Sequence, residues 1–508
     1  MGTPRNEQFC VSSIKFLNIF FLQKNYFIFH KKIFTTLSMN TSFQNFEDEE
    51  PASKKKSRME QEFEKLKDQL SQEGINLSSV EALEEITNFY IQHHHYTEAL
   101  HFADAILATM SYSADAWLRK GIILHSLRKF KEAFSCYQQA LEIDPADPYI
   151  YVNKGITLET TNRLEEALEN YNIALSLDEE NTEALINKAV ILERLERPEE
   201  AEQLLREFVE TQPEHIEAWY ELGYCYDLME RFDDALRCYD HHLDIAPYDY
   251  EAWYNRGVLF QRMGLHSKAI ESYDFSLAIS EHFFPAYYNK GNALASIGRL
   301  LDAIECYHQA LSFEKNDFVI WHNLANAYEE LGQMKEAIQS FSKAIQLNPE
   351  HCDSYFGRGS CYETLEEYRK ALSDYDKALS LKSNDSEIWY AKADVEFQLG
   401  KWREAISSYT TMLRNDPTNC EGWFDYGEVL FDSGFYQESL KAFNQCISLA
   451  PTWAEPYYAK GKVLTFLGKT SEAIDSLQTS FRFDPTKKEF FLREFKHLKE
   501  LLQHFIAQ

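Results

Sequence analysis

Consecutive histidines are the residues of this chain whose type and spacing most directly suggest chemistry, because imidazole is a common metal ligand. His93, His94 and His95 form one run, and His241 and His242 form a second. Adjacent side chains point in different directions, and no carboxylate or second ligand group stands at an offset that would complete a zinc site. A metal-dependent enzyme would need the first run to bind the metal. We expect that it does not, and we interpret both runs as turn or packing residues.

The sequence contains no other pattern typical of catalysis. It lacks a P-loop, a dinucleotide-binding fingerprint, a nucleophile elbow and an H-E-x-x-H motif. Its nine cysteines include no C-x-x-C, and Cys136, Cys238 and Cys306 are separated by multiples of 34 residues. They are therefore interpreted as small apolar residues in a reducing compartment. We predict no enzymatic activity and no cofactor.

Charge and composition narrow the class of partner. The formal net charge of the 508-residue chain is -30, and 15% of the residues are aromatic. An acidic surface repels phosphate, so nucleic acid and anionic membranes are not expected to bind. Basic proteins or basic peptides are favoured instead.

Two recurring sets of side chains could bind a polypeptide, because aromatic rings supply apolar contact and carboxamides both donate and accept hydrogen bonds. Members of each set are separated by 34 residues or a multiple of 34. The aromatic set is Tyr220, Tyr254, Tyr288, His322, Phe356, Tyr390, Phe424 and Tyr458, and the asparagine set is Asn153, Asn187, Asn255, Asn289 and Asn323.

The same 34-residue interval governs most of the chain. One alanine marks it in eleven copies, with Ser439 in its place in a twelfth, and no insertion occurs between Val80 and Lys487. We number each copy from 1 to 34, with Val80 as position 1 and this alanine as position 20. The alanines are Ala99, Ala133, Ala167, Ala201, Ala235, Ala269, Ala303, Ala337, Ala371, Ala405 and Ala473.

Spacing within a copy predicts two antiparallel helices. Positions 4, 8 and 11 share one helix face, and positions 20, 24 and 27 share another. Small residues at 8 and 20 let the two helices approach, while aromatic residues at 4 and 24 fill the space beside them. Proline at position 32 ends the second helix. Glycine at position 15 suits a left-handed residue that ends the first helix, as at Gly264, Gly298, Gly332, Gly400, Gly434 and Gly468.

The pattern W-x-x-x-G-x-x-Y … A-x-x-x-Y-x-x-A … P over 34 residues resembles the tetratricopeptide repeat. The resemblance implies an all-α fold, a right-handed α-solenoid of antiparallel helix pairs whose first helices line a concave groove. One departure is Lys or Arg at position 7, whose stem can pack while its charge stays in water. These residues are Lys120, Lys154, Lys188, Arg256, Lys290, Arg358, Lys392 and Lys460.

By this resemblance the aromatic and asparagine sets face the groove, where they would hold an extended peptide by its main chain. A similar asparagine ladder lines the superhelix of the nucleocytoplasmic glycosyltransferase that modifies Ser and Thr. The alternative interpretation is structural, with the rings in the core and the asparagines bonding across neighbouring repeats.

A carboxylate clamp of the kind found in chaperone-binding relatives is not expected. No Lys or Arg occupies position 5 in any copy, although Asn88, Asn292 and Asn326 stand at position 9. Acids at position 2 in nine copies, from Glu81 to Glu455, would repel a carboxylate further. They either stabilise the helix N-termini or attract basic ligands.

Four segments are expected along the chain. Residues 80–487 form the repeats, 59–79 an N-terminal flanking helix and 488–508 a C-terminal capping helix. Residues 1–58 are a disordered or mis-annotated or targeting tail. We favour translation from Met39, with a targeting peptide or a membrane anchor in residues 1–38 as alternatives.

We therefore expect a cytoplasmic, non-enzymatic scaffold that binds an extended or basic segment of another protein in its groove. The first alternative is an accessory or substrate-recruiting subunit of an enzyme, such as a protein glycosyltransferase carried on another chain. A self-associating structural role is a further alternative. The sequence does not predict the oligomeric state.

Overall fold

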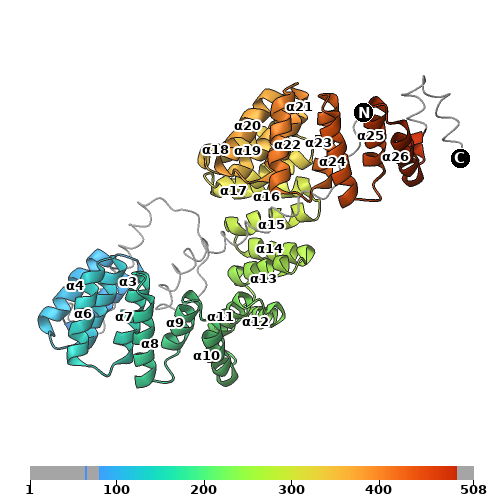
Figure 1. Ribbon diagram of the computed structural model, residues 1–508. Helices are drawn as coiled ribbons and strands as arrows, with labels where there is room; N and C mark the ends of the chain where they lie inside the picture. Colours follow the sequence, from blue (N-terminus) through green and yellow to red (C-terminus); the bar gives the residue numbers. More distant parts are fainter. Residues whose placement is uncertain (1–62, 64, 66–78, 489–508) are drawn as a thin grey trace. The chain divides into compact units, whose positions relative to one another are not determined.

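The structure is a computed structural model that describes Phe63, Lys65 and residues 79–488. All regular secondary structure within these residues is α-helical, and consecutive helices stack in pairs (Figure 1). This confirms the predicted all-α solenoid. The chain divides into two units, with the boundary between Met229 and Glu230.

The helices alternate between 13 and 14 residues, as in α13 and α14. The first unit contains α3 Val80–Gln92, α4 Tyr96–Thr109, α5 Ala114–Ser126, α6 Phe130–Ile143, α7 Pro148–Thr160, α8 Leu164–Leu177, α9 Thr182–Arg194, α10 Pro198–Thr211 and α11 Ile216–Leu228. The second unit contains α12 Phe232–Ile245, α13 Tyr250–Arg262, α14 His266–Ile279, α15 Phe284–Ser296, α16 Leu300–Phe313, α17 Phe318–Glu330, α18 Met334–Leu347, α19 Cys352–Thr364, α20 Tyr368–Leu381, α21 Ser386–Gln398, α22 Trp402–Asn415, α23 Cys420–Asp432, α24 Tyr436–Leu449, α25 Ala454–Phe466 and α26 Thr470–Phe483.

Polar caps and left-handed turns set the helix ends. The residue before each first helix often caps it, as where Ser113 Oγ accepts from the Ala116 amide at 3.2 Å. All six glycines at position 15 have a positive φ, as predicted, and so do six other residues at the same position. These six are His94, Arg128, Asn162, Glu196, Glu230 and Glu366.

The close approach of the two helices in a repeat depends on glycine at position 8. A Cβ added to Gly257 would lie 2.5 Å from the ring of Tyr273 at position 24, and one added to Gly121 would lie 2.4 Å from the ring of Tyr137. Both tyrosines are buried. The predicted partnership of small and aromatic residues is therefore how each pair packs.

The first helices lie on the inner side of the stack in each unit. First helices of successive repeats contact one another, for example α5 with α7 and α15 with α17, whereas the second helices described in the structure do so less. The second helices are therefore farther apart and form the outer side.

Most position 7 cations with an assigned bond do not simply extend into water, which corrects our expectation. Four of them bridge to the aspartate at position 25 of the preceding repeat, because a long side chain from the first helix reaches the neighbouring second helix. The N–O distances are 2.7 Å for Lys120–Asp104, 2.7 Å for Arg256–Asp240, 2.6 Å for Lys290–Asp274 and 2.7 Å for Lys392–Asp376.

The predicted flanking segments lie almost entirely outside the described residues. Phe63 is helical and its ring centroid lies 5.5 Å from that of Phe89 and 5.4 Å from that of Tyr90. The tail 1–58 and residues 489–508 of the C-terminal segment are not described, so those assignments stay predictions. None of the helices described here is long and apolar enough to cross a membrane.

Candidate binding surface of the first helices

The aromatic series at position 5 does not face water as expected. Tyr254, Tyr288 and His322 are buried, with exposed fractions of 5%, 4% and 6%. The cause is packing, since each ring lies against the position 24 ring of its own repeat. Tyr254 and Tyr273, for example, have centroids 5.9 Å apart. The remaining members are half-buried: Tyr220, Phe356, Tyr390, Phe424 and Tyr458.

Two asparagines at position 6 bond across neighbouring repeats, as the structural alternative proposed. Asn289 Nδ2 donates to the Tyr254 hydroxyl at 2.9 Å, and Asn323 Nδ2 donates to the Tyr288 hydroxyl at 3.0 Å. These carboxamide donors are engaged by the fold.

The other members of the asparagine set differ from these two. Asn153 Nδ2 donates to the Tyr149 carbonyl within its own helix at 2.8 Å, and Asn187 is buried. Asn255 is half-buried. The structure therefore does not arrange the five as one uniform ladder, and their binding of a peptide stays a hypothesis.

A pairing rule links position 5 to position 6 of the next repeat, 35 residues later. Tyr390 follows it by donating its hydroxyl proton to the Asp425 carboxylate. Where position 5 is phenylalanine, which has no hydroxyl, the later residue is alanine. The tyrosine pairs are Tyr220/Asn255, Tyr254/Asn289, Tyr288/Asn323 and Tyr390/Asp425, and the phenylalanine pairs are Phe356/Ala391 and Phe424/Ala459.

Two other carboxamides, at position 9, have unused bonding capacity. The Asn292 oxygen accepts from the Tyr307 hydroxyl at 2.8 Å and from Asn323 Nδ2 at 3.0 Å. Asn326 Nδ2 lies 3.1 Å from Nε2 of His322. Among the described residues, this leaves the Asn292 amide as a donor and the Asn326 oxygen as an acceptor.

The first unit gathers carboxylates on its first helices. Loss of hydration raises the pKa of Glu221 to about 8, with further contributions from the charges of Glu217 and Glu159. Loss of hydration, followed by repulsion from Glu217, also raises the pKa of Glu183. Arg194 lies 2.8 Å from Glu159 but leaves the other three carboxylates in excess. Sequence reasoning identified the acids at position 2 but missed Glu221 at position 6.

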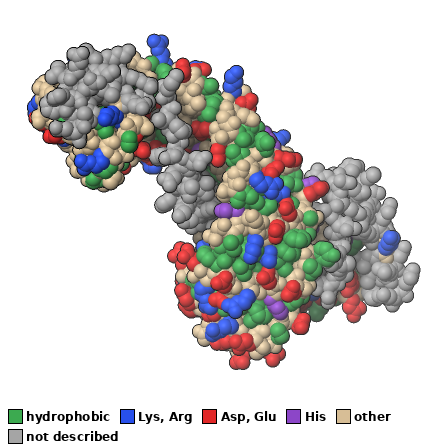
Figure 2. Space-filling model, turned by 90° about the vertical axis from the view of Figure 1, so that its right-hand side faces the viewer, with side chains coloured by type: hydrophobic (Ala, Val, Ile, Leu, Met, Phe, Trp, Pro, Cys, Tyr) green, Lys and Arg blue, Asp and Glu red, His purple; other side chains and the backbone are tan. Residues whose placement is uncertain are grey.

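Exposed rings appear farther along, at positions that the aromatic series did not include. Phe431 packs against Phe466 with ring centroids 5.2 Å apart, and Phe466 is 59% exposed. Lys462 Nζ lies 5.9 Å from the Phe431 centroid. On the face shown in Figure 2, hydrophobic side chains likewise reach the surface in patches between charged groups. Positions 12 and 13, rather than 5, carry these accessible rings.

The histidine run lies in the turn between α3 and α4, and its side chains have separate partners. His93 Nδ1 lies 2.8 Å from the Phe89 carbonyl, and His94 Nδ1 lies 2.9 Å from the Tyr96 hydroxyl. His242 Nε2 is instead 2.9 Å from the Asp249 carboxylate. In the part of the chain that the structure describes, no three His, Cys, Asp or Glu residues are grouped to hold a metal ion.

Comparison with protein families gives matches along most of the repeat array. Models described as tetratricopeptide repeat match residues 114–147, 152–216, 216–249, 250–282, 318–351, 352–385, 390–452 and 454–487, and one described as TPR repeat matches 291–332. A search of curated proteins finds no match.

Several solved structures are similar to parts of the chain. YrrB, described as a TPR protein with an unusual peptide-binding site, is 22% identical over 36% of this chain and 94% of its own, with a TM-score of 0.34. MamA is 17% identical over 33% of this chain and 97% of its own, with a TM-score of 0.32. A tetratricopeptide repeat protein from Parabacteroides merdae is 20% identical over 51% of this chain and 97% of its own, with a TM-score of 0.37.

Proposed function

The chain belongs to the tetratricopeptide repeat family, and we propose that it is a non-enzymatic scaffold that binds a basic, extended segment of another protein along its first helices. Repeats of this family form protein interaction surfaces, and the matches extend over most of the array. The nature of the segment is argued from the side chains that packing does not use.

The excess of carboxylates at Glu183, Glu217 and Glu221 is the observation that carries this proposal. Like charges held close together and partly desolvated are unfavourable, as the raised pKa of Glu221 indicates. A lysine or arginine side chain of a partner would relieve that repulsion. An extended backbone could also bond to Asn292 and Asn326, which offer one donor and one acceptor.

The test compares two matched variants of the full chain. The first carries Glu183→Gln, Glu217→Gln and Glu221→Gln, and the control carries Glu132→Gln, Glu165→Gln and Glu199→Gln. The control residues are exposed on the second helices α6, α8 and α10. Both variants lose three formal negative charges, so a difference between them depends on location rather than on net charge.

Binding is measured by fluorescence anisotropy with an unstructured, lysine-rich peptide of twelve residues. We expect at least a ten-fold weaker affinity for the first variant and little change for the control. Equal weakening in both would mean that only net charge matters, and equal binding by all three proteins would reject the surface. Affinity capture of an enzyme subunit with the same dependence would favour the accessory-subunit alternative.

A further inference from the structure

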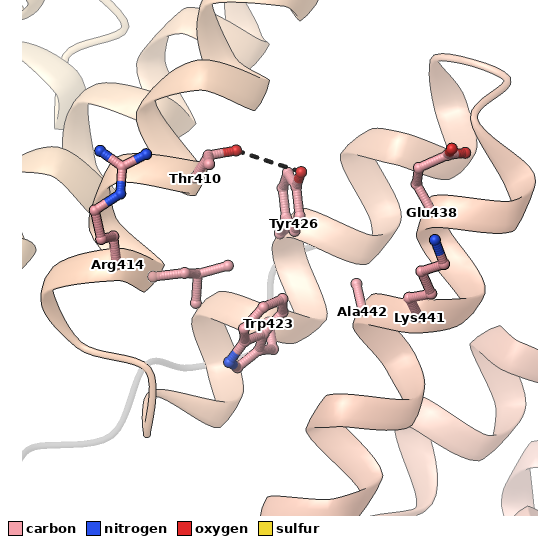
Figure 3. A pocket seen from close by; sticks show the side chains of 8 residues that line it. Thr410, Arg414, Trp423, Tyr426, Glu438, Lys441 and Ala442 are labelled. Carbon is pink, nitrogen blue, oxygen red and sulfur yellow. Dashed lines mark hydrogen bonds between the residues drawn. The ribbon is translucent and has the colours of Figure 1, made fainter.

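A pocket of about 450 Å³ lies on the outer side of the second unit, between the second helices α22 and α24 (Figure 3). The first helix α23 forms its floor. Residues from two successive repeats line it: Thr410, Leu413, Arg414, Trp423, Tyr426, Glu438, Lys441 and Ala442.

Elsewhere in the stack, a cation of the chain itself covers the equivalent place. Besides bridging to the aspartate at position 25, several position 7 cations lie over the tryptophan at position 4 of the same helix. The distances from the cation to the ring centroid are 5.6 Å for Lys120 and Trp117, 5.4 Å for Arg256 and Trp253, and 5.0 Å for Lys392 and Trp389.

This interface has lost both members of the ion pair. Position 7 is Tyr426 and the preceding position 25 is Thr410, whose hydroxyl donates to the Tyr426 hydroxyl at 3.3 Å. Position 23 is Ala442, the smallest side chain at that position in the twelve copies. The ring of Trp423 is therefore left without the cation that covers its counterparts.

The floor of the pocket is held in place before any ligand arrives. Trp423 Nε1 donates to the Pro417 carbonyl at 3.0 Å, which fixes the indole. The Tyr426 ring lies 6.2 Å from Trp423 and 6.2 Å from Tyr409, measured between centroids. Leu413 is buried beneath them. An apolar side chain could therefore bind without reorganisation of this surface.

The rim carries more positive than negative charge. Arg414 and Lys441 are exposed on opposite sides of the two rings (Figure 3). Neither forms an ion pair with a described residue, and Glu438 is the one carboxylate among the lining side chains. A ligand cation above Trp423 would meet these charges without the aspartate that balances it in other repeats.

We propose that this outer pocket binds an acidic peptide segment, whose one large apolar side chain contacts Leu413, Trp423 and Tyr426 while flanking carboxylates pair with Arg414 and Lys441. The pocket is thus a second protein-binding site, with a charge preference opposite to that of the inner surface. Charge complementarity on the rim, and a ring face that is covered in the sister repeats, both support it.

The probe is a fluorescein-labelled peptide in which one p-benzoylphenylalanine is flanked by two aspartates on each side. Its matched control replaces the aspartates with lysines. Anisotropy in 0.15 M salt gives the affinity for the full chain. Photo-crosslinking and peptide mass spectrometry then identify the residues that the benzophenone contacts. We expect saturable binding of the acidic peptide and crosslinks within residues 410–442.

A closing variant tests the pocket itself. Thr410→Asp with Tyr426→Lys restores the ion pair seen at Lys392 and Asp376, so it uses an arrangement that the fold already accommodates. We expect it to weaken binding at least ten-fold, as should Arg414→Glu with Lys441→Glu. The control Lys335→Glu with Lys377→Glu makes the same charge change on α18 and α20 and should leave binding unchanged.

Several results would overturn the proposal: full affinity in the closing variant, preference for the lysine peptide, crosslinks outside the pocket, or no saturable binding. Sedimentation that showed a dimer dissociating in the closing variant would instead assign the pocket to a second copy of the chain. The variant with Glu183, Glu217 and Glu221 changed to glutamine should bind the acidic peptide normally, so this test is independent of the inner surface.

Discussion

At the scale of single residues, the hydroxyl group at position 5 determines what the next repeat places at position 6. Tyr288 buries its ring against Tyr307, with centroids 6.3 Å apart, but its hydroxyl needs a partner at the seam between repeats. Asn323 supplies it at 3.0 Å. Phe356, which has no hydroxyl, is followed by Ala391.

A double-mutant cycle tests this pair. Tyr288→Phe and Asn323→Ala should each lower the free energy of unfolding by about 1 kcal/mol, because each leaves a polar group without its partner. The double variant should lose less than the sum, since it recreates the Phe356/Ala391 combination. Urea unfolding gives the three values. Additive losses would show that the hydrogen bond does not couple the two residues.

His322 makes the stack sensitive to acid at one interface. Its ring is surrounded by Phe341, His351, Ser354 and Asn326, with Nδ1 3.1 Å from the Ser354 hydroxyl. Burial, followed by the charge of His351, lowers the pKa of His322 to about 3. The folded state therefore requires the neutral ring. Stability is fully present above the unfolded pKa of about 6.5 and is lost as pH falls from there toward 3.

Replacing His322 with Phe, the residue at position 5 of two other repeats, should flatten this dependence. Between pH 6.5 and 4 we expect the unfolding free energy of the wild type to fall more steeply, by up to about 1.4 kcal/mol per pH unit. Urea unfolding across that range provides the comparison, with the exposed His282→Phe as control. Parallel pH profiles for wild type and His322→Phe would contradict the account.

At the scale of helices, the turn inside each repeat has the same left-handed residue whether or not it is glycine. Glu366 has φ 59° and Gly332 has φ 75° in equivalent turns. A side chain with a Cβ is strained in that region, while glycine is not. The helix ends are thus imposed by packing in six repeats that lack the favourable residue.

Glu366→Gly should therefore stabilise the protein by about 0.5–1 kcal/mol, because relief of strain exceeds the greater flexibility of glycine in the unfolded chain. The reverse change, Gly332→Glu, should destabilise it by a similar amount. Urea unfolding of both variants checks the sign. A loss of stability in Glu366→Gly would mean that its side chain makes a compensating contact.

Helix boundaries and the core followed from the sequence, whereas the binding surface followed only in part. A small residue at position 8 and a ring at position 24 determine packing within one repeat, so the interval alone revealed them. Whether a ring at position 5 is accessible depends on the neighbouring repeat. That is why Tyr254 was expected in the groove and is found in the core, and why Phe466 was missed.

At the scale of the molecule, contacts are made between neighbours along the chain, and binding surfaces can therefore differ from one repeat to the next without disturbing the rest. The first unit collects carboxylates around Glu221, whereas repeats 10 and 11 in the second unit form the outer pocket at Trp423. The chain uses one structural unit to present distinct local chemistries.

Proton release on binding a basic peptide is the most direct test of the inner surface. Isothermal titration calorimetry of the lysine-rich peptide at pH 7, in two buffers of different ionisation enthalpy, measures it. Glu221, with its pKa raised to about 8, is mostly protonated in the free protein at that pH. A bound cation lowers this pKa, so up to about one proton should leave per complex. The Glu221→Gln variant should release none, and release that is absent in the wild type or unchanged in the variant would contradict the account.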